Sequence, residues 1–255
     1  MKKSWKVVLL VLLVLVLDQA LKIWVKTNVA YGSTGEIEIF GLDWALIHFV
    51  ENPGMAFGLE LGGNYGKLAL SLFRLIAIGF LIYLIREFIK SEVRFGILLS
   101  FSLILAGAIG NIIDSAFYGM LFSASYQGSE IARIFPPEGG YAGFLHGKVV
   151  DMFYFPMFQG IWPDWMPFVG GKYYQFFQPV FNLADVAISV GVLNILLFQR
   201  SFFFKEMEEK RNNKEQLGEE ASIASDLQIA STNANTNNSA ISNNLPPATD
   251  ASNEA

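Results

Sequence analysis

Two short motifs in this sequence place an asparagine and an aspartate three residues apart. Asn111 precedes Asp114 at the end of one long apolar stretch, and Asn182 precedes Asp185 at the start of another. A separation of three residues puts both side chains on one face of a helix. A third carboxylate, Asp151, lies in an apolar segment of the loop between them. A single aspartate at a helix end is ordinarily a cap, but three carboxylates and two carboxamides from separate segments predict a shared site.

Paired aspartates can carry out acid–base chemistry without a covalent intermediate. Two carboxylates held close together cannot both ionise cheaply, so the pair can act as a base toward water and as an acid toward a peptide carbonyl. Nearby asparagines would hold the carboxylates or donate to a developing oxyanion. The chain has no cysteine and no Gly-x-Ser-x-Gly or Ser-x-x-Lys motif, so covalent catalysis has no good candidate. The same carboxylates would also suit a proton- or cation-coupled transporter.

The composition is that of a membrane protein. Of the 255 residues 53% are hydrophobic, 15% are aromatic and only 16% are charged, whereas a soluble domain has about a quarter of its residues charged. A net charge of −5 argues against a nucleic-acid partner. With no cysteine and only His48 and His146, thiolate and histidine-built metal sites lack ligands. We therefore expect no metal and no cofactor.

Four stretches are long and apolar enough to cross a bilayer core, which takes roughly 20 helical residues. They cover residues 7–25, 68–85, 95–113 and 180–199. The first resembles a secretory signal, but no small-x-small cleavage site follows Leu17, so we predict a retained span. Within it, Asp18 and Lys22 are four residues apart and would either neutralise each other or contact a substrate. Arg74, in the second stretch, is expected to extend to the lipid headgroups.

Basic residues cluster on one side of the predicted membrane. They precede the first span, separate the second from the third, and follow the fourth: Lys2, Lys3 and Lys6; Arg86, Lys90 and Arg94; Arg200, Lys205, Lys210, Arg211 and Lys214. The two large loops carry fewer basic residues over much more sequence. Because lysine and arginine in short loops stay in the cytoplasm, we predict that both termini are cytoplasmic and that both large loops lie outside.

The loops and the C-terminus differ in composition from the spans. In the first loop, residues 36–40 and 44–50 predict short strands at the membrane surface, followed by a turn at 51–54. The third loop, residues 114–179, is long and rich in tryptophan and proline, which suits an interfacial lid. Residues 206–255 are polar and predict a disordered cytoplasmic tail, leaving a membrane domain over residues 1–205.

Five motifs occur in order along these segments. They are Asp-x-x-x-Lys at 18–22, Asn-Pro-Gly-Met-Ala-Phe-Gly at 52–58, Gly-Asn-Ile-Ile-Asp at 110–114, Val-Val-Asp at 149–151 and Phe-Asn-Leu-Ala-Asp at 181–185. In this order, over roughly residues 5–200, the chain resembles the bacterial lipoprotein signal peptidases (signal peptidase II). The resemblance implies a four-span aspartic endopeptidase of the bacterial inner membrane that needs no cofactor. Its partners would be membrane lipid and diacylglyceryl-modified prolipoproteins, cut just before the lipidated cysteine.

The resemblance also implies roles for single residues. Asp151 and Asp185 match the catalytic aspartates. Supporting or substrate-binding positions match Asn52, Gly54, Asn111, Asp114, Asn182, Asp18 and Lys22. The chain departs from the family at Ser115, where an arginine is usual, and in an enlarged outer loop on either side of Asp151. One hypothesis is that Arg133, in that loop, supplies the missing positive charge; the alternative is an ordinary solvated arginine.

Two other classes of protein fit part of the pattern. A transporter would use the outer carboxylates for protons or cations, but four spans with no repeated half argue against it. A membrane scaffold acting through its polar tail would give no reason for five clustered polar motifs. The peptidase is therefore the favoured interpretation.

Overall fold

The computed structural model describes residues 2–53 and 63–199, together with the single positions 211 and 216. The chain divides into two units, Met1–Gln199 and Arg200–Ala255. The described fold is that of the first unit. The predicted tail over residues 206–255 lies outside the described residues except at those two positions.

Three of the predicted spans are confirmed as long apolar helices. Helix α1 covers Lys3–Asn28, α2 covers Gly63–Lys90 and α3 covers Phe95–Ile113. Helix α3 continues through a π-helical turn, Asp114–Tyr118, into the short α4, Gly119–Leu121. By length and composition these helices can cross a membrane. Helices α1 and α2 run beyond both boundaries expected from hydropathy, because polar residues at the ends still form helical hydrogen bonds, whereas α3 has the expected bounds.

The fourth predicted span begins later than expected. Helix α5 covers Leu183–Asn194 and continues as a π-helix, Ile195–Gln199, so its described part is shorter than the other three. Its N-cap is Asn182, whose side chain accepts a hydrogen bond from the backbone N–H of Asp185, while the Asp185 side chain accepts from the backbone N–H of Asn182. This capping box ends the preceding extended segment and fixes the first turn of α5.

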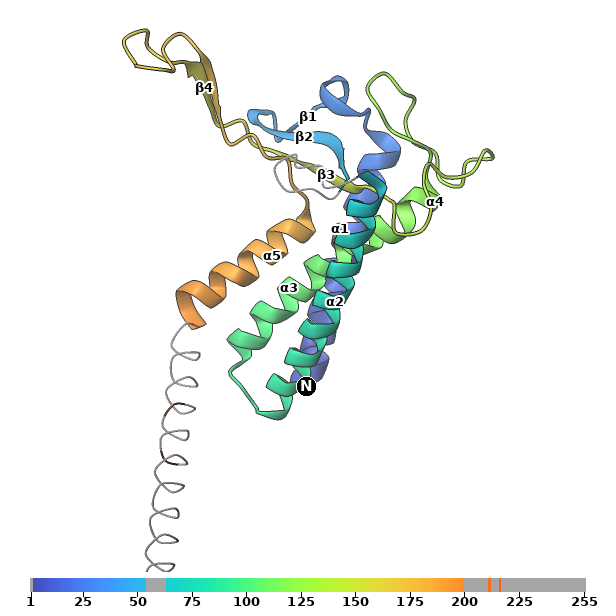
Figure 1. The fold of residues 1–255 in the computed structure, drawn as a ribbon, viewed down its shortest axis with the longest axis vertical. Coiled ribbons are helices and arrows are strands. Elements are labelled where there is room, and N and C mark those ends of the chain that lie inside the picture. Colours follow the sequence, from blue (N-terminus) through green and yellow to red (C-terminus); the bar gives the residue numbers. More distant parts are fainter. Residues whose placement is uncertain (1, 54–62, 200–210, 212–215, 217–255) are drawn as a thin grey trace, which may run out of the picture. The chain divides into compact units, whose positions relative to one another are not determined.

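Helix α3 is the central helix of the bundle. It contacts α1, α2 and α5, and it is the most buried of the three long helices (Figure 1). A side chain at Gly107 would collide with the backbone oxygen of Ala184, so glycine is what lets α3 and α5 approach closely. By contrast, α1 and α2 leave large apolar side chains exposed, among them Leu13, Val16, Phe73 and Ile76. Faces of this kind suit contact with lipid.

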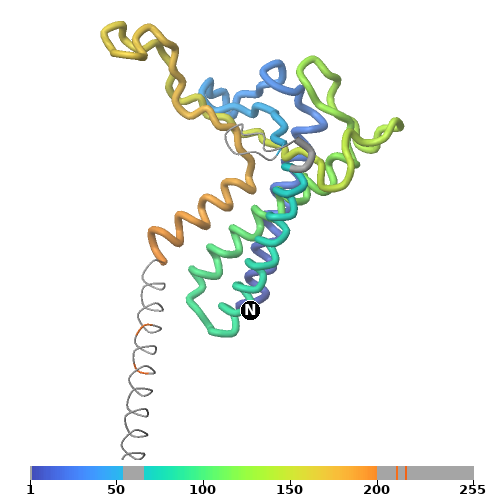
Figure 2. The backbone as a smooth tube through the Cα atoms, viewed as in Figure 1, coloured from blue at the N-terminus to red at the C-terminus, as the bar shows by residue number. Residues whose placement is uncertain are grey.

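A small antiparallel sheet lies at the end of the helices opposite the N-terminus (Figure 2). Its strands are β1, Ile37–Ile39, β2, Leu42–Asn52, and β3, Val149–Tyr154, in the order β1-β2-β3. The two strands predicted in the first loop are thus confirmed. Strand β3 was not expected, because its run of buried residues does not alternate. It pairs with β2 so that Val50 lies opposite Asp151.

The sheet packs on the ends of α1 and α3 through a buried apolar cluster. Val150 and Met152 of β3 are fully buried beside Asp151. The cluster also contains Val25, Val29, Phe49, Tyr118 and Phe122. Burial of the residues on both sides of Asp151 fixes the backbone that carries this carboxylate.

The enlarged loop after β3 forms a second, two-stranded sheet. Strands β4, Phe158–Ile161, and β5, Tyr173–Phe176, pair with each other and extend away from the helices (Figure 1). This hairpin exposes many large apolar side chains: Phe158, Ile161, Trp165, Phe168, Tyr173 and Phe176. That this loop acts as an interfacial lid stays a prediction.

Candidate active site

Strand β3 and the start of α5 are joined by backbone hydrogen bonds. The amide of Phe153 donates to the carbonyl of Phe181 at 2.8 Å, and the amide of Phe181 donates back at 3.1 Å. The amide of Met152 also donates to Phe181, at 3.1 Å. Because Asp151 and Asn182 each lie one residue beyond these bonds, the pairing brings the β3 aspartate to the helix N-terminus that carries Asp185.

Two carboxamides link the two aspartates. Asn182 Nδ2 donates to Asp151 Oδ1 at 2.6 Å and to Asn111 Oδ1 at 3.2 Å. Asn111 Nδ2 in turn donates to Asp185 Oδ1 at 2.8 Å. Four of the five residues predicted to converge from separate segments therefore form one continuous hydrogen-bonded chain. Both asparagines therefore hold carboxylates, which is one of the two roles expected of them. The other is donation to a developing oxyanion.

Lys22 neutralises the supporting carboxylates. Its fully buried Nζ lies 3.0 Å from Asp18 Oδ2 and 2.9 Å from Asp114 Oδ2, and it donates to Asn111 Oδ1 at 2.9 Å. Three acceptors satisfy the three N–H groups of the ammonium. The ion pair between Asp18 and Lys22, one of the two alternatives expected from the sequence, is present, and Asp114 is a second partner that spacing within one helix could not reveal.

Asp18 and Asp114 also hold the elements that carry the other two aspartates. Asp18 Oδ1 accepts from the backbone N–H of Ala184 in the first turn of α5, at 2.9 Å. Asp114 Oδ2 accepts from the backbone N–H of Val150 in β3, at 3.2 Å. A side chain on Gly110 would come within 2.7 Å of Asp18 Oδ2, so this glycine leaves room for the carboxylate. Both carboxylates are thus positioning groups.

Gln19 is a site residue that the sequence reasoning missed. Its Nε2 donates to Asp114 Oδ1 at 2.9 Å and to Asp18 Oδ2 at 3.1 Å, and its Oε1 accepts from the hydroxyl of Tyr118 at 3.2 Å. The available signal was a second polar residue beside Asp18 within an apolar helix. An uncharged amide carries a smaller insertion cost than a charge, so it did not stand out.

Asp151 is held in an environment that opposes its ionisation. Its residue is 4% exposed. Burial, with the charge of Asp185 as the second cause, raises the pKa of Asp151 to about 7. Hydrogen bonds from Asn182 and Asn52 and the charge of Lys22 act in the opposite direction. A carboxyl that keeps its proton near neutrality can donate it to a carbonyl oxygen.

Arg74 points into the protein, next to the site. The expectation that it extends to the lipid headgroups is therefore wrong. Arg74 Nη1 donates to the hydroxyl of Ser115 at 3.3 Å. That hydroxyl donates to the carbonyl of Asn111 at 3.1 Å, and Ser115 is 2% exposed. A cation from the neighbouring helix α2 therefore contacts position 115, where the sequence motif has serine.

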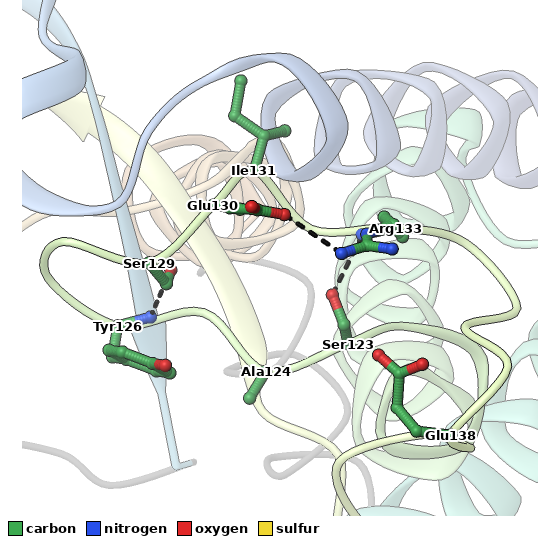
Figure 3. Close-up of a pocket in the computed structure, with 8 residues that line it drawn as sticks. All are labelled: Ser123, Ala124, Tyr126, Ser129, Glu130, Ile131, Arg133 and Glu138. Carbon is green, nitrogen blue, oxygen red and sulfur yellow. Dashed lines mark hydrogen bonds and ion pairs between the residues drawn. The ribbon is translucent and has the colours of Figure 1, made fainter.

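Arg133 does not take that role. Its guanidinium pairs with Glu130 at 3.0 Å and its backbone N–H donates to the hydroxyl of Ser123, around a shallow loop pocket (Figure 3). Both side chains of the pair are exposed. An exposed arginine and glutamate three residues apart form an ordinary surface pair. This agrees with the alternative interpretation, in which Arg133 is an ordinary solvated arginine.

A second buried ion pair lies between α1 and the sheet. Lys26 Nζ pairs with Glu51 of β2, donates to the hydroxyl of Ser125 and faces three aromatic rings, Phe49, Phe122 and Tyr141. Lys148, just before β3, lies 3.5 Å from Glu51. The pair joins α1, β2 and the start of β3 next to the site.

Asn52 and Gly54 were also predicted to belong to the site. Asn52, at the end of β2, hydrogen-bonds Asp151, whereas Gly54 lies outside the described residues. In the described part of the chain, no group of three histidine or acidic side chains is arranged to hold a metal ion. Two carboxyls, Asp151 and Asp185, are held in one hydrogen-bonded chain and are the groups available for acid–base chemistry.

Comparison with known proteins agrees with these motifs. The family described as Signal peptidase (SPase) II matches residues 10–203. A lipoprotein signal peptidase of Porphyromonas gingivalis is 52% identical over 189 residues, covering 74% of this chain and 80% of that protein. One of Amoebophilus asiaticus is 40% identical over 201 residues, covering 78% and 80%. A solved bacterial membrane enzyme is 23% identical with a TM-score of 0.48, covering 75% of this chain and 90% of that one.

The family match spans most of the chain and includes every motif that carries the predicted site. The two relatives are also similar well above the level of a shared fold alone. The chain therefore belongs to the signal peptidase II family.

Proposed function

We propose that this membrane protein is an aspartic endopeptidase that removes the signal peptide from diacylglyceryl-modified prolipoproteins, cutting before the lipidated cysteine. The observation that carries the proposal is the hydrogen-bonded chain from Asp151 through Asn182 and Asn111 to Asp185. The names of the relatives support the substrate class. They give no support to the alternative of a proton- or cation-coupled transporter.

The two aspartates have different roles in the proposed reaction. Asp151, whose pKa is raised, is the acid, and Asp185 is the ionised base. A water molecule gives a proton to Asp185 as its oxygen attacks the scissile carbonyl carbon. Asp151 gives its proton to the carbonyl oxygen, which produces a tetrahedral diol. The diol then returns a hydroxyl proton to Asp151 while Asp185 protonates the leaving nitrogen, and the C–N bond breaks.

The surrounding residues keep this pair in position. Asn111 and Asn182 hold the two carboxylates, and Asn52 contacts Asp151 from β2. Lys22 neutralises the carboxylates that hold β3 and α5, namely Asp18 and Asp114. Gly54 is proposed to contribute to substrate binding, as the family motif implies.

We further propose the orientation of the protein in a bacterial inner membrane. The helix beginning at Leu183 would be the fourth span, both termini would be cytoplasmic, and the site would face the periplasm. The exposed aromatic hairpin of β4 and β5 suits the headgroup region. Residues 1–205 would form the peptidase domain and 206–255 a cytoplasmic tail, with no nucleic-acid partner. A reporter fused at Gly139 should behave as periplasmic; a cytoplasmic signal would contradict this topology.

The test of the function is cleavage of a defined precursor. The purified protein in detergent should release the signal peptide from a diacylglyceryl-modified precursor and leave the unmodified precursor intact, as read by gel and mass spectrometry. Asp151→Asn and Asp185→Asn should each suppress cleavage by orders of magnitude, and the double variant should lose little more, because the two act as one unit. Asp43→Asn, at an exposed position of β2, is the matched control. Normal cleavage by either site variant would refute that assignment.

A further inference from the structure

Arg74 lies on the face of α2 that packs against α3. Leu68 and Ile78 contact the buried cluster of Ile112, Ala116 and Leu145. The hydroxyl of Ser71 donates to the carbonyl of Leu145 at 3.2 Å. Positions 68, 71, 74 and 78 follow one another at intervals of three or four and so share a helical face. The packing of this face directs Arg74 into the protein, toward the site.

The Ser115 hydroxyl presents an acceptor to Arg74. Its proton is committed to the carbonyl of Asn111, so its lone pair receives the guanidinium N–H. Ser115 follows Asp114 directly and is buried in the π-helical turn at the end of α3. Among the described residues Arg74 forms no ion pair. It is therefore a partly buried cation held by a neutral contact.

The site holds more negative than positive charges when Arg74 is left out of the count. Lys22 already neutralises two carboxylates, Asp18 and Asp114. The pair of Asp151 and Asp185 adds one further negative charge when it shares a proton. The guanidinium of Arg74 is linked to the pair by contacts: it donates to Ser115, which bonds to the carbonyl of Asn111, and the Asn111 side chain donates to Asp185. Without Arg74, three negative charges would face the single positive charge of Lys22.

We propose that Arg74, held by the Ser115 hydroxyl, is the counter-charge that sets the pH range in which the aspartate pair carries exactly one proton. Arg74 is thus a positioning residue that acts on the aspartate pair through its charge. Its effect on cleavage rests on the proposed function. The groups facing the pair are Asp18 and Lys22 on α1, Arg74 on α2 and Asp114 on α3.

The experiment measures the protonation of the pair with and without substrate. The carbonyl stretch of protonated carboxyls is followed by infrared spectroscopy against pH in wild type, Arg74→Gln, Arg74→Lys and Ser115→Ala, with Asp151→Asn to identify the Asp151 band. In parallel, kcat/KM for the diacylglyceryl-modified precursor is measured against pH. Arg133→Gln removes an exposed arginine outside the site and is the matched control.

We expect Arg74→Gln to move the midpoint of the Asp151 band and both limbs of the pH profile upward by about one pH unit or more. A unit charge within several ångströms has an effect of this size in a partly buried site. Arg74→Lys should shift both by less than half as much, because it keeps the charge, and Arg133→Gln should shift neither. Ser115→Ala should give an intermediate shift.

An unchanged band midpoint in folded Arg74→Gln would overturn the proposal. A higher KM with an unchanged pH profile would also overturn it, since Arg74 would then be a contact to substrate. Wild-type protein that fails to cleave the precursor would refute the proposed function alone, because the infrared titration needs no substrate and still decides the role of Arg74.

Discussion

The raised pKa of Asp151 means that this carboxyl lowers the stability of the fold at neutral and alkaline pH. A carboxyl that only supports the fold would raise it. In the folded protein the pKa of Asp151 is about 7, against 3.8 as its ordinary value. An acid with a raised pKa binds its proton more tightly in the folded state, so the stability that this proton contributes is complete below about pH 4 and is lost as the pH rises to about 7. Replacing Asp151 with asparagine removes that ionisation and keeps the shape, and the new carbonyl oxygen can still accept from Asn182.

The expected gain follows from the size of the pKa shift. About three pH units at roughly 1.4 kcal/mol each amount to about 4 kcal/mol at pH 8. At pH 5 the folded Asp151 is protonated and the unfolded side chain is mostly ionised, but the pH is only about one unit above the ordinary pKa of 3.8. The gain there falls to about 1–2 kcal/mol. The catalytic variant Asp151→Asn should therefore be inactive yet more heat-stable, and more so at pH 8 than at pH 5.

The assay is thermal unfolding in one detergent at pH 5 and pH 8, comparing wild type with Asp151→Asn. Asp43→Asn, on the exposed part of β2, should leave the melting temperature unchanged at both pH values. Asp114→Asn should lower it at both, since Asp114 pairs with the buried Lys22. A stability gain for Asp151→Asn that is absent at pH 8, or equal at the two pH values, would refute the reasoning that Asp151 is the protonated member of the pair.

Three further predictions concern pH, packing and metals. Cleavage should fall about tenfold per pH unit above about pH 7, as Asp151 loses the proton that it donates; a flat rate from pH 7 to 9 would contradict its role as acid. Glu51→Gln leaves the buried Lys26 without its closest carboxylate and should cost about 3–5 kcal/mol, seen as a lower melting temperature, whereas Glu130→Gln in an exposed pair should cost at most about 1 kcal/mol. Chelation by EDTA should leave cleavage intact, and activity that is lost and then restored by magnesium or calcium would argue for a cation held by the carboxylates instead.

The convergence of the site residues could be predicted because each is polar in an apolar context. A carboxylate or carboxamide in a span must find a partner, and Asn111, Asn182 and Asp185 could be expected to find one another at the helix ends. The strand carrying Asp151 could not be recognised, since residues buried on both faces give no alternation. Its pairing with Phe181 joins segments far apart in the chain, which no local pattern encodes.

The role of Arg74 was misjudged for a related reason. Helix α2 is apolar on every side, so the sequence does not show which side faces protein and which faces lipid. Extension to the headgroups was therefore the default expectation for an arginine in a span. Only the packing of Leu68 and Ile78 on α3 reveals that position 74 faces inward.

The different roles of the four aspartates likewise follow from the groups that they contact, since their residue type is the same. Asp18 and Asp114 share the ammonium of Lys22 and accept backbone N–H groups from α5 and β3, so their charges are used to hold the fold. Asp151 and Asp185, among the described residues, receive only neutral amide donors. Asp18 and Asp114 thus share an ammonium as their partner, whereas Asp151 and Asp185 are held by amides. The placement of Lys22, one helical turn after Asp18 and opposite Asp114, is therefore what separates the positioning pair from the proton-sharing pair.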